Sequence, residues 1–269
     1  TMPPAGQAAI LSQPGGPARY PVMARSNPSA EDNRSMKLSA WQRLRATYRQ
    51  LGFIRTSTYV TDRLLRALNP TFCLYQYQLV AQPLSEQPRL PANRGKAFSF
   101  RVLDAPDPLL DSLPRPTAVI AQRFAQGAQC LAAVKDERLA GCIWFARGSY
   151  MEDEVRVDYC LPTGRSCVWD FDVFVAESER LGFLFAKLWD IFDAHLKTEG
   201  VAWTLSRINS LNQYSLASHL RLGAAACGWA MILRLSAFEL LVSNLAPYLS
   251  AGTRKRQALR LPLPLRAPR

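Results

Sequence analysis

The segment from Val173 to Leu196, VFVAESERLGFLFAKLWDIFDAHL, passes from a strand pattern to a helix pattern within a few residues. Its apolar run ends at the polar stretch AESERLG, and apolar residues then recur at helical spacing. Gly200 ends the predicted helix, and the following run VAWTLSRI is typical of a strand. Strand, helix and strand in this order predict a crossover unit. The turn before the helix is either an ordinary turn in a packed core or a loop that binds phosphate groups.

Strand patterns also precede and follow this crossover unit. Two strands are predicted around KDER and two around PTGR. The other predicted elements are a strand at 97–104, one or two helices at 106–127, a short helix at 212–223 and strands at 228–235 and 237–242. Antiparallel strands followed by a crossover unit predict an α/β fold of mixed α+β type, with a central mixed β-sheet flanked by helices.

Composition divides the chain into four parts. Residues 1–36 are rich in Pro, Gly, Ala and Ser, which predicts a disordered N-terminal extension. Residues 37–95 hold two basic helical patterns, a strand pattern and a proline-rich linker. The predicted domain spans 96–246, and 247–269 is predicted to be a basic C-terminal tail.

The net charge of +12 is carried by the two flanks of the predicted domain. Residues 37–70 hold seven basic side chains and one acid, and residues 252–269 hold six basic side chains and no acid. Residues 71–251 sum to −1. Such flanks suit an anionic membrane surface or an acidic protein, or they only aid solubility. Nucleic acid is the weakest candidate, because the central domain is nearly neutral and has no known reading motif.

Residue usage indicates the compartment. Six scattered cysteines without a CxxC pair favour a reduced cytoplasmic protein over a disulfide framework. Two histidines without metal-ligand spacing argue against a zinc site, so no metal is expected. Because no run of about 18 uncharged apolar residues occurs, no membrane span is expected. We therefore expect a cytoplasmic protein, with peripheral membrane attachment through the basic flanks left open.

Two short segments resemble family signatures. The first is the turn before the long helix, where Gly182 matches a glycine of a phosphate-loop pattern. The second is NQYSLASHLRLG, which shares Asn212, Ser215 and Gly223 with its pattern. Together with the element order from Ala97 to Leu241, these segments resemble the GNAT superfamily, whose members transfer an acyl group from acyl-CoA to an amine.

The chain departs from the family patterns at four positions. Glu179 stands where Arg or Gln is usual, and Leu184 stands where a second Gly or Ala is usual. In the second segment, His219 replaces the usual Tyr, and Ala224 replaces the usual Phe. These departures concern catalytic competence rather than the fold.

The resemblance implies where acyl-CoA would bind. A helix N-terminus offers unpaired N–H groups to a pyrophosphate, and Gly182 allows a close approach. The residues implied at this loop are Arg180, Leu181, Gly182, Phe183, Leu184 and Phe185. The resemblance implies that the backbone of Phe174 and Val175 hydrogen-bonds the pantetheine arm and that Asn212 contacts the same arm. Ser215 is a further candidate for binding the cofactor. A carboxylate at position 179 would repel pyrophosphate, or it would cap the helix as in an ordinary turn.

Acyl transfer also needs groups that move protons. His219 is the candidate proton donor to the departing thiolate, since an imidazole titrates near neutrality. The alternative is a helix-face histidine without a chemical role. Asp170 and Asp172 are candidate bases that share one face of a strand, with pairing to a neighbouring Arg as the alternative. The acidic stretch Met151–Glu154 is expected to be solvated, and Trp169 and Trp203 are expected in the core.

Three functions remain open. The first is acyl-CoA-dependent N-acyl transfer, acetyl being the leading acyl group, by direct transfer to an unknown amine in a ternary complex. The second uses a longer acyl chain on an acidic acyl carrier protein, which the basic flank 37–70 would suit. The third is a non-catalytic GNAT-like module that binds a membrane surface or an acidic partner. None of the three functions excludes a homodimer.

Overall fold

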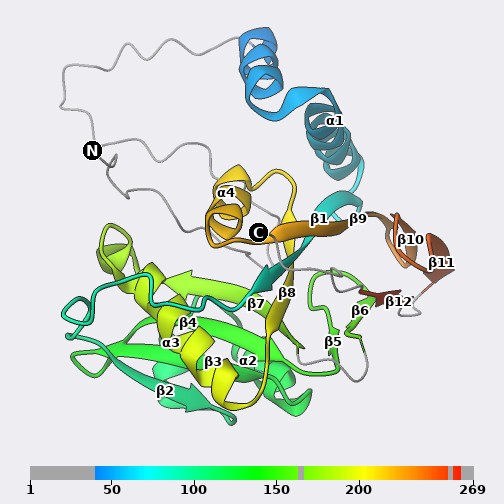
Figure 1. Ribbon diagram of the computed structural model, residues 1–269. Helices are drawn as coiled ribbons and strands as arrows, with labels where there is room; N and C mark the ends of the chain where they lie inside the picture. Colours follow the sequence, from blue (N-terminus) through cyan, green and yellow to red (C-terminus); the bar gives the residue numbers. More distant parts are fainter. Residues whose placement is uncertain (1–39, 163–166, 254–256, 262–269) are drawn as a thin grey trace.

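The computed structural model describes residues 40–162, 167–253 and 257–261 (Figure 1). Within these ranges, nine strands form one mixed sheet in the order β11-β10-β9-β1-β8-β7-β4-β3-β2. Their bounds are β1 Cys73–Pro83, β2 Ser99–Leu103, β3 Gln129–Lys135, β4 Arg138–Ala146, β7 Cys167–Val175, β8 Trp203–Asn209, β9 Ala225–Leu235, β10 Phe238–Ser243 and β11 Leu249–Thr253. A second sheet pairs β12 (Gln257–Arg260), β6 (Val157–Cys160) and β5 (Ser149–Met151) in that order. The predicted mixed fold is confirmed.

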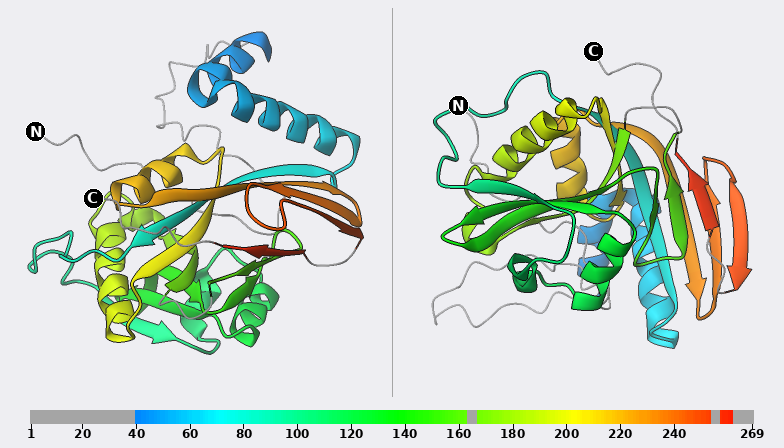
Figure 2. Two further views of the ribbon diagram at one scale, coloured as in Figure 1. Left: turned by 45° about the vertical axis from the view of Figure 1, so that its right-hand side comes forward. Right: turned by 90° about the horizontal axis from the view of Figure 1, so that it is seen from below.

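Helices cover both faces of the large sheet (Figure 2). One face packs on α3 (Leu184–Thr198) and α4 (Gln213–Arg221), and the other packs on η1 (Pro108–Ser112) and α2 (Thr117–Ala125). The short η2 (Glu177–Glu179) precedes α3. The small sheet lies on the α2 side, where Tyr159 of β6 stacks on Trp169 of β7. Each face of the large sheet therefore has its own buried cluster.

The large sheet is antiparallel except at one pair of strands. Pairs β2–β3, β3–β4 and β4–β7 are antiparallel, whereas β7 and β8 are parallel and joined through α3. This is the crossover that the opening segment predicts. Its helix has 15 residues, from Leu184 to Thr198, and so ends before Gly200 as predicted.

The N-terminal region belongs to the same sheet. β1 pairs with β8 on one edge and with β9 on the other, so the expected boundary at residue 96 separates β1 from the strands that it pairs with. The linker after β1 is also anchored, because Ser85 N–H and Leu90 N–H donate to Asp193 and Asp190 of α3. The division at 95/96 is therefore corrected: β1 is an interior strand of the domain.

The helix α1 (Ala40–Leu68) leads into β1. It is kinked at Gly52, whose φ of 75° interrupts the helix and divides it into two helical segments, as the two helical patterns in 37–95 predict. At the other end of the chain, the predicted tail contains β11, which extends the large sheet, and β12, which pairs in parallel with β6. The tail prediction is thus wrong for 249–253 and 257–260, since backbone pairing orders them. The predicted disordered extension 1–36 lies outside the described residues.

Two properties concern the part of the chain that the structure describes. All six cysteines are free thiols there. None of its helices is both long enough and apolar enough to cross a membrane.

Candidate functional site

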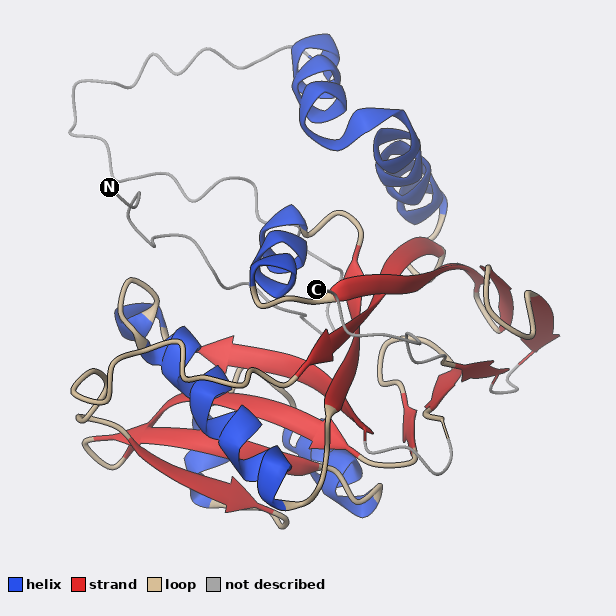
Figure 3. Ribbon diagram, viewed as in Figure 1, coloured by secondary structure: helices blue, strands red, loops and turns tan. Residues whose placement is uncertain are grey.

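The strands β7 and β8 pair only at their beginnings. The paired residues are Cys167 with Trp203, Val168 with Thr204 and Trp169 with Leu205. Beyond these, β7 continues to pair with β4 as far as Val175, and β8 continues to pair with β1 as far as Asn209. The two strands diverge from this point (Figure 3). Their facing edges, 170–175 and 206–209, are therefore not paired with each other within the described strands.

The loop at the end of β7 leads into an uncapped helix. No described side chain caps the N-terminus of α3. The first N–H groups of a helix have no acceptor inside it, and the helix dipole gives this end a partial positive charge. Gly182 lies in a tight turn, where an added Cβ would come 3.3 Å from the carbonyl oxygen of Glu179. These features suit a close approach by an anion to the loop.

The charges on this loop are partly neutralised. Glu179 accepts a hydrogen bond from Lys135 of β3 at 2.8 Å, and this pair is partly exposed. Its carboxylate is therefore held by a cation rather than left to repel an anion alone. Arg180 Nε donates to the carbonyl of Val175 at 3.3 Å, which occupies one of the backbone groups predicted to contact pantetheine.

The apolar side chains of the loop divide into two groups. Leu184 is fully buried and packs in the α3 cluster, so it points into the sheet and leaves the loop surface clear. Leu181 and Phe183 are exposed, and the guanidinium of Arg94 lies 4.8 Å from the Phe183 ring centroid.

Asp170 is the first residue of β7 beyond the paired segment. It is only 2% exposed, and burial raises its pKa from 3.8 to about 7. The hydroxyls of Thr204 and Ser206 lie near enough to oppose this rise in part. Even so, Asp170 Oδ2 and Thr204 Oγ1 have no well-aligned hydrogen-bond partner among the described residues. A carboxyl group with this pKa can both accept and release a proton near neutrality.

Asp172 lies on the opposite face, contrary to the sequence expectation. The ladder between β4 and β7 is irregular here, because Phe171 and Phe174 face Trp144 and Cys142, and Asp172 has a φ of 49°. This bulge breaks the alternation of the strand. The Asp172 carboxylate instead accepts hydrogen bonds from Arg115 Nε at 2.8 Å and Arg123 at 2.6 Å. The alternative of pairing with Arg is correct for Asp172.

His219 is buried in α4 and does not have the expected near-neutral pKa. Its Nδ1 lies 3.2 Å from Gln82 Oε1, and its ring meets Trp189 edge-on. Burial lowers its pKa from 6.5 to about 4, so the ring is neutral at pH 7. The prediction that His219 titrates near neutrality is therefore wrong.

Asn212 and Ser215 begin the helix α4. Asn212 is its N-cap, and its side chain accepts a hydrogen bond from the backbone N–H of Ser215 at 3.1 Å. This contact explains why the two residues occur three apart. Contact of either residue with a pantetheine arm stays a prediction.

The acidic stretch Met151–Glu154 is largely buried rather than solvated. Arg207 of β8 pairs with Glu152 at 2.5 Å and with Glu154 at 3.4 Å. Asp153 pairs with Arg123 at 3.0 Å. Burial alone would raise the pKa of Glu152, but Arg207 outweighs it and the pKa is lowered. Sequence reasoning missed this cluster because its cations come from other elements. The expectation for Trp169 is confirmed, since it is fully buried, and Trp203 packs against the same core.

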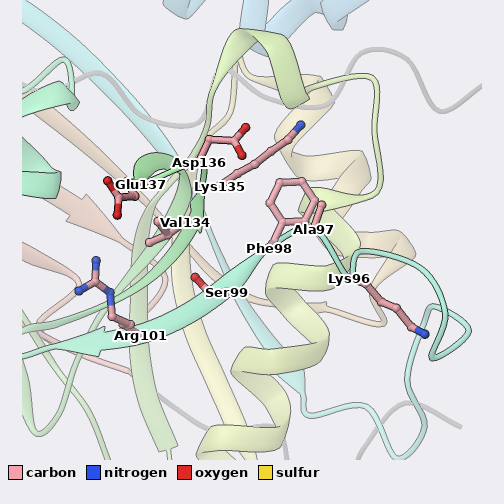
Figure 4. A pocket seen from close by; sticks show the side chains of 9 residues that line it. All are labelled: Lys96, Ala97, Phe98, Ser99, Arg101, Val134, Lys135, Asp136 and Glu137. Atoms are coloured by element: carbon pink, nitrogen blue, oxygen red, sulfur yellow. The ribbon is translucent and has the colours of Figure 1, made fainter.

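A separate hollow lies at the outer edge of the large sheet (Figure 4). It is open and lies between β2 and the turn from β3 to β4. The side chains that line it include Lys96, Arg101, Lys135, Asp136 and Glu137. Lys135 connects this edge with the loop before α3 through its pair with Glu179.

The elements from β2 to β10 follow the order that the sequence resemblance predicts, with the loop between β7 and α3 at the end of the crossover strand. This arrangement agrees with the fold that the resemblance to the GNAT superfamily implies.

No protein-family model matches the chain, and no curated protein matches it. One similar solved structure is a functionally unknown conserved protein from Staphylococcus epidermidis ATCC 12228, with 12% identity, a TM-score of 0.44 and coverage of 65% of this chain and 66% of that one. Another is a tandem GNAT protein from the clavulanic acid biosynthesis pathway, solved without AcCoA, with 15% identity, a TM-score of 0.39 and coverage of 57% and 50%. The chain thus spans about two thirds of the length of the first and half of the second.

Proposed function

We propose that this chain is an acyl-CoA-dependent N-acyltransferase, with acetyl as the first acyl group to test. The observation that carries the proposal is the divergence of β7 and β8, with an uncapped helix N-terminus where β7 ends. The pyrophosphate would contact the amides between Arg180 and Phe185. The pantetheine arm would extend along the unpaired edge of β7 from Val175 toward Asp170.

Asp170 is our candidate for proton transfer, because its pKa of about 7 is raised by burial at the point where β7 and β8 cease to pair. The acceptor amine attacks the thioester carbonyl, so a C–N bond forms and the C–S bond breaks. The amine loses a proton to Asp170, directly or through water held beside Thr204. The protonated carboxyl then has a proton to return to the departing thiolate. A pKa of about 7 suits both steps. A backbone N–H on the free edge of β7 would stabilise the oxyanion.

Binding and turnover test this proposal separately. Acetyl-CoA should raise the melting temperature with increasing concentration, because a ligand of the native state alone stabilises it. Leu181→Asp should abolish the shift by placing a carboxylate beside the loop amides, while Leu220→Asp should not. Both leucines are exposed, so both variants should fold. The absence of any shift with acetyl-CoA, longer acyl-CoAs and free CoA would overturn the proposal.

A non-catalytic acyl-CoA-binding module is the second candidate. It is favoured by the burial of Asp170 and by the engagement of Asp172 with two arginines. Release of free thiol from acetyl-CoA in the presence of a panel of primary amines separates the two functions. A thermal shift without thiol release from any amine would favour the binding module.

A further inference from the structure

The second half of α1 has its polar and apolar faces reversed relative to an ordinary surface helix. Its buried side chains are Thr56, Thr58 and Asp62. Its exposed side chains include four large apolar groups, at fractional exposures of 73% for Phe53, 65% for Ile54, 62% for Leu64 and 79% for Leu68. A helix packed on a globular core normally buries its apolar side.

The polar face is held by specific contacts with the body of the protein. Thr58 Oγ1 donates to Gln76 of β1 at 3.1 Å. Asp62 accepts from the backbone N–H of Leu74 at 2.9 Å and pairs with Arg66 at 2.9 Å. These contacts fix the rotation of the helix about its axis, so the exposure of the other face is part of the fold.

The exposed apolar side chains lie on one side of the helix, where the exposed Ser57 and Thr61 lie among them. At about 100° per residue, positions 53, 64 and 68 fall within a narrow sector and position 54 falls at its border. Val60, half-buried, lies in the same sector. We define this set, Phe53, Ile54, Val60, Leu64 and Leu68, as the α1 strip. The polar face of this half of α1 contacts β1, and the exposed apolar side chains lie outside that contact.

The charge on α1 indicates what can cover this strip. The helix sequence holds six arginines and a single acid, Asp62, which is buried and paired. Arg63 is exposed. A second copy of the chain would bring the same positive charge to the contact. The chain's own flanks would do so as well, since residues 1–39 hold four basic and two acidic side chains and residues 252–269 hold only basic ones.

We propose that the α1 strip docks on an anionic lipid surface, with its apolar side chains in the headgroup region and the exposed Arg63 near the lipid phosphates. A helix with Phe and Leu on one face and arginine as its exposed charge fits such a surface. This inference rests on α1 alone and is independent of the proposed acyl transfer.

Co-sedimentation of the full chain with vesicles tests the proposal, and no acyl-CoA is needed. The chain should bind vesicles of phosphatidylcholine with about 30% phosphatidylglycerol, and it should bind pure phosphatidylcholine at least about tenfold more weakly. High salt should weaken binding, because the attraction is partly electrostatic.

Two matched variants assign the binding to the strip. Leu64→Ser with Leu68→Ser should lower the partition coefficient at least about tenfold, since two apolar side chains no longer enter the lipid. Leu220→Ser with Leu249→Ser replaces two exposed leucines on α4 and β11 and should leave binding unchanged. Equal binding by both double variants would overturn the proposal. Failure of the unmodified chain to bind anionic vesicles would also overturn the proposal. An acidic protein would then be the remaining partner for the α1 strip.

Discussion

Asp170 and Asp172 are two residues apart on β7, yet their carboxylates lie on opposite faces of the large sheet. Asp170 faces the α3 side, beside Thr204, and Asp172 pairs with Arg115 and Arg123 on the α2 side. The bulge at Asp172 causes this separation. The two carboxylates therefore differ in environment: Asp170 forms no ion pair with a described residue, and Asp172 belongs to an ion-pair cluster.

Replacement of Asp170 should change both stability and turnover. The pKa of the Asp170 carboxyl is 3.8 in the unfolded state and about 7 in the folded state. Between these pH values the folded state holds one more proton than the unfolded state, so stability falls as pH rises. The full difference is on the order of 4 kcal/mol above pH 7.

Asp170→Asn removes this titration and should therefore be more stable than the unmodified protein at pH 8. It should also lose at least about 100-fold in turnover if Asp170 is the base. Urea denaturation at pH 5 and pH 8 measures the first effect, and thiol release measures the second. Unchanged turnover would remove Asp170 from the mechanism.

His219 should produce the opposite dependence on pH. Its folded pKa of about 4 lies below the unfolded value of 6.5. As pH falls from 6.5 to 4, His219 binds a proton in the unfolded state but not in the folded state. The free energy of unfolding therefore decreases by a value on the order of 3 kcal/mol. His219→Gln should abolish this slope between pH 6.5 and 4, measured by urea denaturation. It should keep turnover at pH 8, because at this pH the ring is neutral and holds no extra proton for the departing thiolate. A large loss of turnover with intact acyl-CoA binding would contradict this assignment.

Asp172 should be important for stability. Removing its charge takes away the carboxylate that Arg115 and Arg123 share, although Arg123 keeps its pair with Asp153. Breaking a buried ion pair typically costs about 3–5 kcal/mol. Asp172→Asn should lower the free energy of unfolding by about this amount, measured in urea. Asp104→Asn is a suitable control, since Asp104 is exposed beside β2. Similar losses for both variants would show that the buried ion pairs contribute little.

The sequence predicts elements better than it predicts faces and partners. The crossover β7–α3–β8 is visible in local patterns, because strand and helix periods depend on nearby residues. The run Leu79–Ala81, buried on both faces, is the local signal that β1 is interior, and the prolines after it concealed that signal. The position of β1 between β8 and β9 depends on pairings far apart in the chain.

The same reason explains the errors at the candidate site. The face of Asp172 depends on a bulge opposite β4, which a period of two cannot predict. The burial of Glu152 depends on Arg207, 55 residues further along the chain. The loop at Gly182 could be predicted because its turn and helix start are local.

Lys135 and Glu179 form an ion pair beside the loop that we propose as the pyrophosphate site. Glu179 stands where the GNAT pattern has Arg or Gln, and it holds Lys135 by a partly exposed ion pair. Glu179→Gln should change stability little, because exposed pairs contribute little. It should tighten acetyl-CoA binding several-fold, since it removes a negative charge and releases Lys135 toward the anion. Glu177→Gln changes the net charge equally on the same loop without releasing Lys135, so it should tighten binding less. Calorimetric titration of both variants with acetyl-CoA measures the difference. Weaker binding by Glu179→Gln would mean that the carboxylate orders the loop rather than opposes the ligand.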